Sequence, residues 1–190
     1  MMKTVFDLTI DNPTLIQGKQ LNNLFILSTF FYNACLKRGN FFKLSPEDIP
    51  YDKINYKGKT IKINFKKLNL GIKYAIIKRL RMSVLALSKL KKQGFKVGKI
   101  KPKNKISSVP LSGYPVYFGL DRAGKLLKIK DVGEFKVNGI EKIPYDFEVC
   151  FAVLKKTSNR YSLKVLMQKK SEISTTYQKN KLFKNSLIFQ

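Results

Sequence analysis

The chain contains no histidine, and this absence excludes several classes of enzyme. Without an imidazole there is no Ser–His or Cys–His nucleophile, no histidine-ligated zinc and no general base of the commonest kind near neutral pH. Neither a GxxxxGKS/T phosphate loop nor a GxGxxG turn occurs. Cys35 and Cys150 stand too far apart in sequence for a four-ligand zinc site of the usual kind. We expect them to be reduced, partly buried thiols of a cytosolic protein.

Acidic residues are missing from the middle of the chain. The stretch from Lys53 to Leu120 spans 68 residues and contains 18 Lys and Arg but no Asp or Glu. We call it the acid-free segment. The whole chain has 38 basic and 12 acidic residues, a formal charge of +26. A compact domain tolerates such self-repulsion most readily when a polyanion supplies the counter-charge.

Genome composition and membrane binding account for this charge less well than a nucleic-acid partner does. An AT-rich genome adds lysine codons, but it does not remove acidic residues over 68 positions. An anionic membrane surface is the weaker alternative, because the cations are not gathered on one amphipathic terminal helix. The strongest apolar run, Leu24 to Phe31, is also far shorter than the ~20 residues that cross a bilayer. The composition therefore predicts a nucleic-acid partner, no membrane partner, and a cytoplasmic protein associated with the nucleoid or with ribonucleoprotein.

The few acidic residues do not form a convincing catalytic set. Glu47, Asp48 and Asp52 are close in sequence, and such a cluster could in principle hold a magnesium ion for phosphodiester cleavage. Loop acids before Pro50 are more typical turn formers and helix caps. We therefore expect no catalytic residue, no metal site, no cofactor and no enzymatic activity.

The N-terminal half predicts one strand and two helices. Residues 3–10 form a β-branched, alternating segment typical of a strand. Asn12-Pro13-Thr14 then predicts a helix start, with a capping residue followed by proline in the first turn, and Lys37-Arg38-Gly39 predicts its end. Residues 41–64 are weakly patterned and contain several breakers. A second helix is predicted over about 67–93, with Leu90 closing its apolar stripe.

The C-terminal half predicts β-structure after a basic linker at 94–113. Residues 126–137 and 147–167 each have the pattern of a hairpin. At 190 residues and 44% hydrophobic content the chain can bury a core. We expect an α+β fold: a small β-barrel interrupted by a helical insertion of two main helices. The expected division is 1–11 for the first barrel strand, 12–105 for the insertion, 106–170 for the rest of the barrel and 171–190 for a basic tail.

Candidate binding residues follow from this division. One side of the second helix is expected to present cations that continue into the linker, and two tyrosines beside the linker are candidates to stack on unpaired bases. A tyrosine that packs its ring inside is the ordinary alternative. The predicted site consists of Lys78, Arg81, Lys89, Lys92, Lys96, Lys99, Lys101, Lys103, Lys105, Tyr114 and Tyr117.

Several short motifs occur in the same order as in a known family. Phe31-Tyr32-Asn33-Ala34-Cys35-Leu36 resembles an aromatic-Tyr-Asn-x-x-Leu helix pattern, and Gly98 to Lys103 is similar to a Gly-x-Pro-x-x-Lys linker. The segments 127–137, 147–156 and 160–169 resemble the paired strands that follow. Over about residues 3–170 the chain looks like the N-terminal, wedge-plus-recognition half of the transposon-encoded TnpB (OrfB) proteins, which are related to type V CRISPR effectors.

The resemblance implies binding without cleavage. In that family the last strand leads into a RuvC-like nuclease domain with a Gly-Ile-Asp-x-Gly motif and a Cys-x-x-Cys ribbon, and this sequence contains neither. The wedge and recognition parts grip guide RNA and the RNA–DNA duplex. The implied function is therefore a non-catalytic RNA- or DNA-binding protein. Two alternatives stay open: the binding subunit of a split nuclease completed by a separate RuvC-like chain, and a basic structural protein of a virion or ribonucleoprotein.

Overall fold

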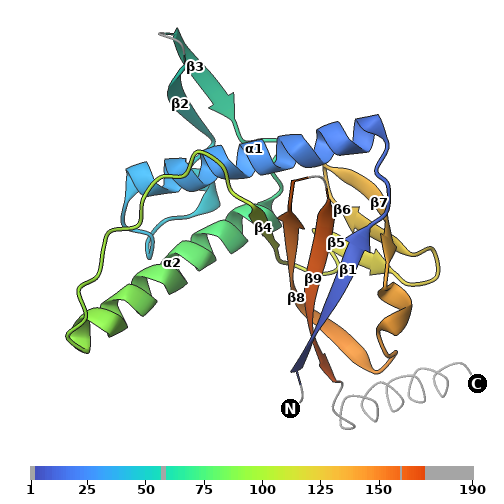
Figure 1. Ribbon diagram of the computed structural model, residues 1–190. Helices are drawn as coiled ribbons and strands as arrows, with labels where there is room; N and C mark the ends of the chain where they lie inside the picture. The colour runs from blue at the N-terminus through green and yellow to red at the C-terminus, as the bar shows by residue number, and fades with distance from the viewer. Residues whose placement is uncertain (1–2, 57–58, 159, 170–190) are drawn as a thin grey trace, which may run out of the picture.

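The computed structural model describes residues 3–56, 59–158 and 160–169, and it has an α+β fold. The predicted basic tail at 171–190 lies outside the described residues. Figure 1 shows one long helix that runs across the top of a barrel-like sheet, and a second long helix and a hairpin that extend away from the sheet. The elements are β1 (Lys3–Ile10), α1 (Leu15–Arg38), a 3-10 turn η1 (Pro46–Asp48), β2 (Tyr51–Tyr56), β3 (Lys59–Asn64), α2 (Leu70–Lys92), β4 (Ser108–Leu111), β5 (Phe118–Asp121), β6 (Leu126–Ile129), β7 (Gly133–Asn138), a second turn η2 (Ile140–Lys142), β8 (Phe147–Lys156) and β9 (Tyr161–Lys169).

Seven strands form one antiparallel sheet that curls into a nearly closed barrel. Their order is β4-β8-β9-β1-β7-β6-β5, so β4 and β5 are its two edges. The predicted hairpins β6–β7 and β8–β9 are confirmed. The N-terminal strand also joins the sheet as expected: β1 lies between β9 and β7, with Leu8 opposite Leu163.

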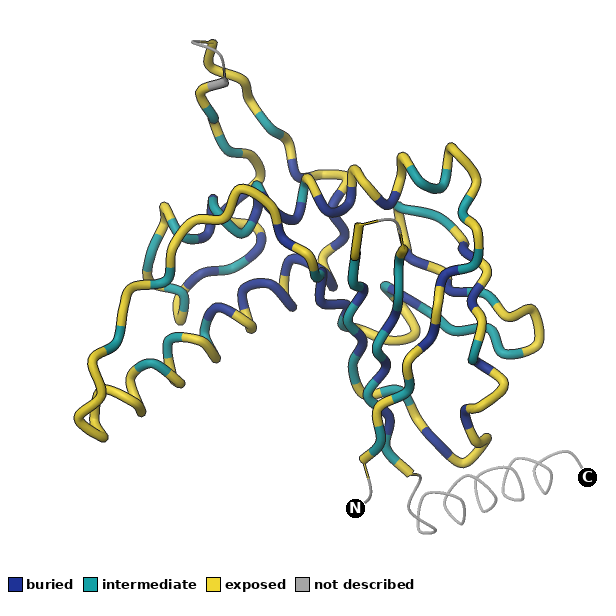
Figure 2. Tube along the Cα trace, in the orientation of Figure 1, coloured by how far each residue is buried: buried dark blue, intermediate teal, exposed yellow. Residues whose placement is uncertain are grey.

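Alternation along the strands places the apolar side chains inside the barrel. On β7, Phe135 and Val137 are buried whereas Glu134 and Lys136 are exposed. On β9, alternate residues from Leu163 onward are buried in the same way. Figure 2 shows this pattern as buried and exposed segments that alternate along the barrel strands. One apolar core continues from the barrel into the two helices.

The chain leaves the barrel after β1 and returns to it at β4, and both helices lie in that insertion. We call residues 12–105 the arm. The start of α1 is two positions later than expected: Thr14 rather than Asn12 is the cap, its hydroxyl accepts from Gln17 N, and Pro13 precedes the cap. The prediction that Pro13 lies in the first turn is therefore wrong. Thr14 N also donates to Gln17 Oε1 at 2.9 Å. This reciprocal bond completes a capping box, which satisfies two backbone donors and so favours Thr14 as the cap.

The second helix crosses from the barrel outward. Asn69 caps it by accepting from Ile72 N at 3.0 Å, so the helix begins three residues after the predicted start. Ile72, Ile76 and Leu80 are buried as expected, but Leu90 is 41% exposed. The apolar stripe therefore ends before the helix does. No residue from 81 to 92 is buried, and the outer half of α2 projects beyond the core (Figure 2).

The weakly patterned segment 41–64 contains a hairpin. Strands β2 and β3 pair antiparallel, with Ile54 opposite Ile61, and project away from the rest of the arm (Figure 1). At the base, Ile49 and Phe65 are fully buried, and Phe65 N donates to Pro50 O at 3.1 Å. We call β2 and β3 the ribbon. Within the described ranges, no helix has the length and apolar character needed to cross a bilayer.

Candidate nucleic-acid interface

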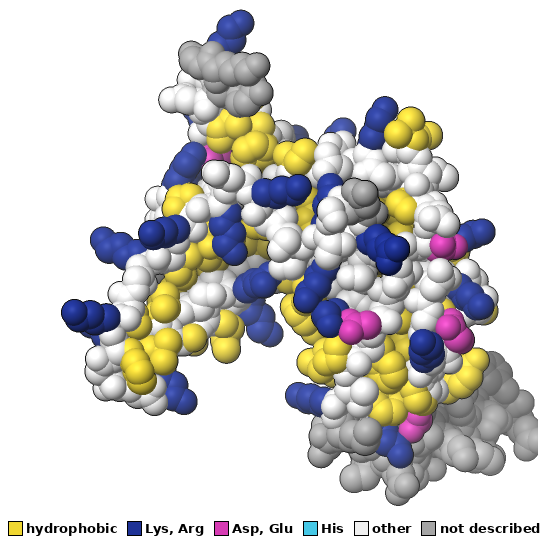
Figure 3. All heavy atoms as spheres, viewed as in Figure 1, with side chains coloured by type: hydrophobic (Ala, Val, Ile, Leu, Met, Phe, Trp, Pro, Cys, Tyr) yellow, Lys and Arg dark blue, Asp and Glu magenta, His cyan; other side chains and the backbone are white. Residues whose placement is uncertain are grey.

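Positive charge is concentrated on the arm rather than on the barrel. Residues 12–105 contain 22 basic and 3 acidic residues, a net charge of +19. Residues 1–11 and 106–170, which supply the barrel strands, contain 13 basic and 8 acidic residues, a net charge of +5. Figure 3 shows Lys and Arg side chains spread over the arm, while most of the visible acidic side chains lie on the barrel. The fold therefore places most of the excess positive charge on the arm, and the barrel carries a much smaller net charge.

The arm's cations have few acidic partners. Among the described residues there are four ion pairs, and none of them includes a residue of the acid-free segment. Three of the pairs lie on the barrel, and the fourth joins Lys37 to Asp52 at the base of the ribbon (2.6 Å). Unpaired exposed cations repel one another, and phosphate groups relieve that repulsion.

Three predicted residues of α2 lie on an exposed side of that helix. Lys78, Lys89 and Lys92 are all exposed. Large apolar side chains are interspersed on this side: Tyr74, Met82 and Leu85 are each at least 50% exposed. A groove of about 460 Å³ separates this side of α2 from the barrel, with Lys78, Arg79 and Met82 on one wall and Phe151 and Val153 of β8 on the other.

Arg81 does not belong to this exposed set, and the expectation that its side chain is exposed is wrong. Its Nε donates to Phe41 O at 2.6 Å and its Nη2 donates to Leu44 O at 2.8 Å. The guanidinium therefore holds the loop after α1 against α2. Lys73 is likewise not available, because it is buried and desolvation lowers the pKa of its ammonium group. The side chains of Arg81 and Lys73 therefore contribute to the packing of the arm and are not counted among its exposed cations.

We expect Arg81→Ala to lower the free energy of unfolding by about 2 kcal/mol, because it leaves two carbonyl groups without their donors. Arg81→Lys should restore little of this loss, since an ammonium group cannot reproduce the two-pronged geometry. The matched control is Lys78→Ala, one turn earlier and exposed, which should change stability by less than about 0.5 kcal/mol. Urea unfolding of the three variants measures the difference. Equal stability of Arg81→Ala and Lys78→Ala would contradict this role.

The predicted linker cations lie on a pinned segment rather than on a free loop. Asn33 of α1 holds Lys103 from both sides: its amide donates to Lys103 O at 2.8 Å and its carbonyl accepts from Lys103 N at 2.9 Å. Thr29 Oγ1 accepts from Ile106 N at 3.2 Å. The ammonium of Lys103 also lies 5.1 Å from the ring centre of Tyr32. All five predicted linker lysines are exposed: Lys96, Lys99, Lys101, Lys103 and Lys105.

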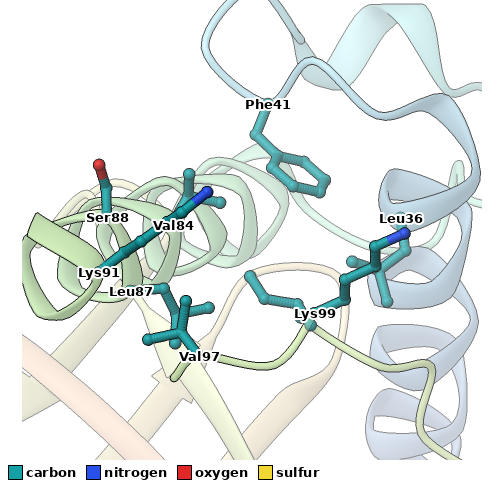
Figure 4. Close-up of a pocket in the computed structure, with 9 residues that line it drawn as sticks. Leu36, Phe41, Val84, Leu87, Ser88, Lys91, Val97 and Lys99 are labelled. Atoms are coloured by element: carbon teal, nitrogen blue, oxygen red, sulfur yellow. The ribbon is translucent and has the colours of Figure 1, made fainter. Parts of the chain in front are cut away.

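The linker and the exposed side of α2 do not form one continuous face, contrary to expectation. The linker packs against the side of α2 that carries Val84, Leu87 and Lys91, around a pocket of about 410 Å³ (Figure 4). At 100° per residue, Lys78 and Lys89 lie roughly half a turn away from that side. Cations therefore line both sides of the arm, and the two sets meet only near the end of α2.

The two predicted tyrosines differ in their surroundings. Tyr117 packs closely on two glycines: a Cβ at Gly71 or at Gly113 would lie 2.7 Å or 2.5 Å from Tyr117 atoms. Its ring joins α2 to the barrel, and the stacking prediction is not supported. Tyr114 is 41% exposed and contacts Phe118 edge-on. It lines a pocket beside Tyr145, which is 86% exposed and was not predicted from the sequence.

Glu47 and Asp48 have the capping role expected of the acidic cluster, whereas Asp52 lies on β2 and forms an ion pair. Asp48 accepts from Ser45 N at 2.7 Å, Glu47 accepts from the Ser45 hydroxyl, and Asp52 pairs with Lys37. The bond from Ser45 lowers the pKa of Glu47. Among the residues that the structure describes, no three His, Cys, Asp or Glu side chains lie close enough to hold a metal ion.

The cysteines are unpaired in the structure but differ in burial. Cys35 is buried, and desolvation raises the pKa of its thiol to about 12, so the reactive thiolate is suppressed. Cys150 is exposed, which corrects the expectation that both are partly buried.

The sequence analysis named no candidate binding residue on the ribbon. Its lysines Lys53, Lys59 and Lys62 nevertheless belong to the acid-free segment and are exposed.

Comparison with known proteins found no family model that matches the chain and no curated protein that matches it in sequence.

Proposed function

We propose that this chain is a nucleic-acid-binding protein without catalytic activity of its own. It binds structured RNA or an RNA–DNA duplex, in the manner of the guide-RNA- and target-binding half of a TnpB-type RNA-guided nuclease. The observation that carries the proposal is the arm with its net charge of +19, whose exposed cations have few acidic partners. Nucleic-acid binding of this kind rests mainly on phosphate contacts, which position the partner without reading its sequence.

The form of the arm supports an extended partner rather than a small anion. The exposed cations of α2 and of the linker are spread along two elements, with apolar and aromatic side chains between those of α2. A small anion needs convergent donors, whereas a polyanion can follow a line of separate charges. The groove beside Lys78 and Arg79 gives such a partner a path between the arm and the barrel.

Binding and cleavage are tested in one competition experiment. A labelled hairpin RNA is bound first, and unlabelled RNA hairpin, RNA–DNA duplex, single-stranded RNA and polyphosphate compete for it. The proposal expects the folded RNA or the hybrid duplex to compete at least about tenfold better than polyphosphate, a difference of about 1.4 kcal/mol. It also expects every strand to remain intact with magnesium or manganese. Equal competition by all polyanions would identify a non-selective packaging protein, and metal-dependent cleavage lost in Glu47→Ala would identify a nuclease.

A further inference from the structure

The ribbon is firmly held at its base, and beyond the base most of its described residues are exposed. At the base, Phe65 packs edge-on against Phe31 of α1 with ring centres 5.2 Å apart. Lys37 donates to Asp52 at 2.6 Å and to Lys53 O at 3.1 Å. An isolated two-stranded hairpin is at best marginally stable in water. These contacts therefore explain how the ribbon can project from the arm.

The pairing register gives the ribbon two unlike faces. Directly opposed residues share a face, and successive pairs alternate between faces. One face carries Ile54 opposite Ile61, and Ile63, which packs against the core. On the other face every residue is exposed, none is acidic, and the side chains are basic or can form hydrogen bonds. We call it the outer face, and it consists of Tyr51, Lys53, Asn55, Thr60, Lys62 and Asn64.

The outer face contains a charge arrangement that the protein alone does not compensate. Lys53 and Lys62 are directly opposite each other on neighbouring strands. Like charges in such a pair destabilise a hairpin, whereas opposite charges would stabilise it. The ammonium of Lys62 lies 4.1 Å from the ring centre of Tyr51, which moderates the repulsion but adds no negative charge. An anionic partner between the two lysines would remove the repulsion between their ammonium groups.

We infer that the outer face of the ribbon binds in the major groove of a B-form DNA duplex. The inference rests on the proposed function and adds a DNA segment to the nucleic acid that the arm holds. The groove is about 12 Å wide and admits a two-stranded ribbon. Lys53 and Lys62 contact the phosphates, and Asn55 and Thr60, which bond to each other at 3.0 Å, face the base edges. Asparagine and threonine side chains suit that position, because they match groups on adenine and thymine.

The same geometry disfavours double-stranded RNA as the ribbon's partner. The major groove of A-form RNA is deep and too narrow for side chains to read, and its minor groove is shallow. Single strands offer no groove at all. The ribbon therefore predicts a preference among nucleic acids that net charge cannot produce, since DNA and RNA duplexes both carry two charges per base pair.

The experiment compares Lys53→Glu/Lys62→Glu with the control Lys136→Glu/Lys142→Glu on the barrel. Both variants change the charge by the same amount at exposed positions, and the ribbon variant keeps a like-charged cross-strand pair. Affinity is measured for a DNA duplex, an RNA duplex of the same sequence, a single strand, and a DNA duplex whose cytosines carry glucosylated hydroxymethyl groups that fill the major groove. Loss of two phosphate contacts should weaken DNA-duplex binding by about 30-fold near physiological salt. The barrel control's affinity for the DNA duplex, and the ribbon variant's affinity for the RNA duplex, should change by less than about threefold. Glucosylated DNA should bind the parent protein as weakly as plain DNA binds the ribbon variant.

A third variant separates binding from folding. Lys53→Glu alone creates an opposite-charge pair with Lys62, so amide hydrogen exchange in the ribbon should become slower while affinity for the DNA duplex falls. If the ribbon variants bind duplex DNA like the control, or if glucosylation has no effect, the inference is overturned while RNA binding by the arm still stands. If the parent protein binds no nucleic acid at any salt concentration, the proposed function itself fails.

Discussion

Reversing Lys78, Lys89 and Lys92 to Glu is expected to weaken nucleic-acid binding by about 100-fold at physiological salt, the effect of losing three phosphate contacts. The three side chains are exposed on one side of α2, and two of them lie on its outer half. None of them has an acidic partner among the described ion pairs. Folding should be unchanged, because none of them contributes to the core. Arg81 is left out of the set because its guanidinium supports the loop after α1.

The matched control is Lys3, Lys136 and Lys142 reversed to Glu on the barrel. These residues are also exposed, and the change in net charge is the same. The control should lose less than about tenfold, since only general attraction is reduced. Fluorescence anisotropy with a labelled hairpin RNA measures both. Equal losses would mean that net charge alone drives association and that α2 has no special part in binding.

The same substitution at two helical glycines should have opposite effects on stability. In α2, a Cβ at Gly71 would lie 2.4 Å from Ser112 O and 2.7 Å from Tyr117 Cβ, so Gly71→Ala forces the helix away from the barrel. The Ser112 hydroxyl donates to Gly71 O at 2.8 Å, which shows how close the two parts are. We expect a loss of about 3 kcal/mol in the free energy of unfolding, the upper end for overpacking.

Gly18 of α1 provides the control. A Cβ there meets no atom within 4 Å, and the backbone is helical. Gly18→Ala should therefore raise stability by about 0.5–1 kcal/mol, because alanine loses less backbone freedom on folding. Chemical unfolding of both variants gives the comparison. A neutral Gly71→Ala would mean that α2 is not clamped to β4 as closely as the structure indicates.

Much of the barrel could be predicted because its strands follow a local rule. Alternation on β7 and β9 and the turns between paired strands are visible in sequence. The neighbours of β1 were not, because its contacts with β9 and β7 join residues more than 100 positions apart. The ribbon was missed because Pro46, Pro50 and Gly58 give this part of the sequence the pattern of a loop. Its apolar face is also too small to give a clear period.

The site residues show the same division between local and tertiary information. Exposure of Lys78 and Lys89 followed from helical spacing. Arg81 falls at the edge of the same side, and only the position of the loop at Phe41 and Leu44 turns it inward. The path of the linker over α1 depends on Asn33, which forms two hydrogen bonds with the backbone of Lys103. The periodicity of the sequence does not predict these bonds. Charge could be predicted from composition, whereas its division into two sides of the arm could not.

The central claim, that the basic arm binds nucleic acid through its phosphates, is tested most directly by a salt titration of affinity. Binding of a labelled RNA hairpin is measured from about 50 to 300 mM salt. With five to eight phosphate contacts, log K should fall against log salt with a slope of about −4 to −7. The arm reversal at Lys78, Lys89 and Lys92 should reduce the magnitude of this slope by about 2 to 3, and the barrel control should leave it almost unchanged. A slope near zero, or no measurable binding of any RNA or DNA at the lowest salt, would contradict the claim.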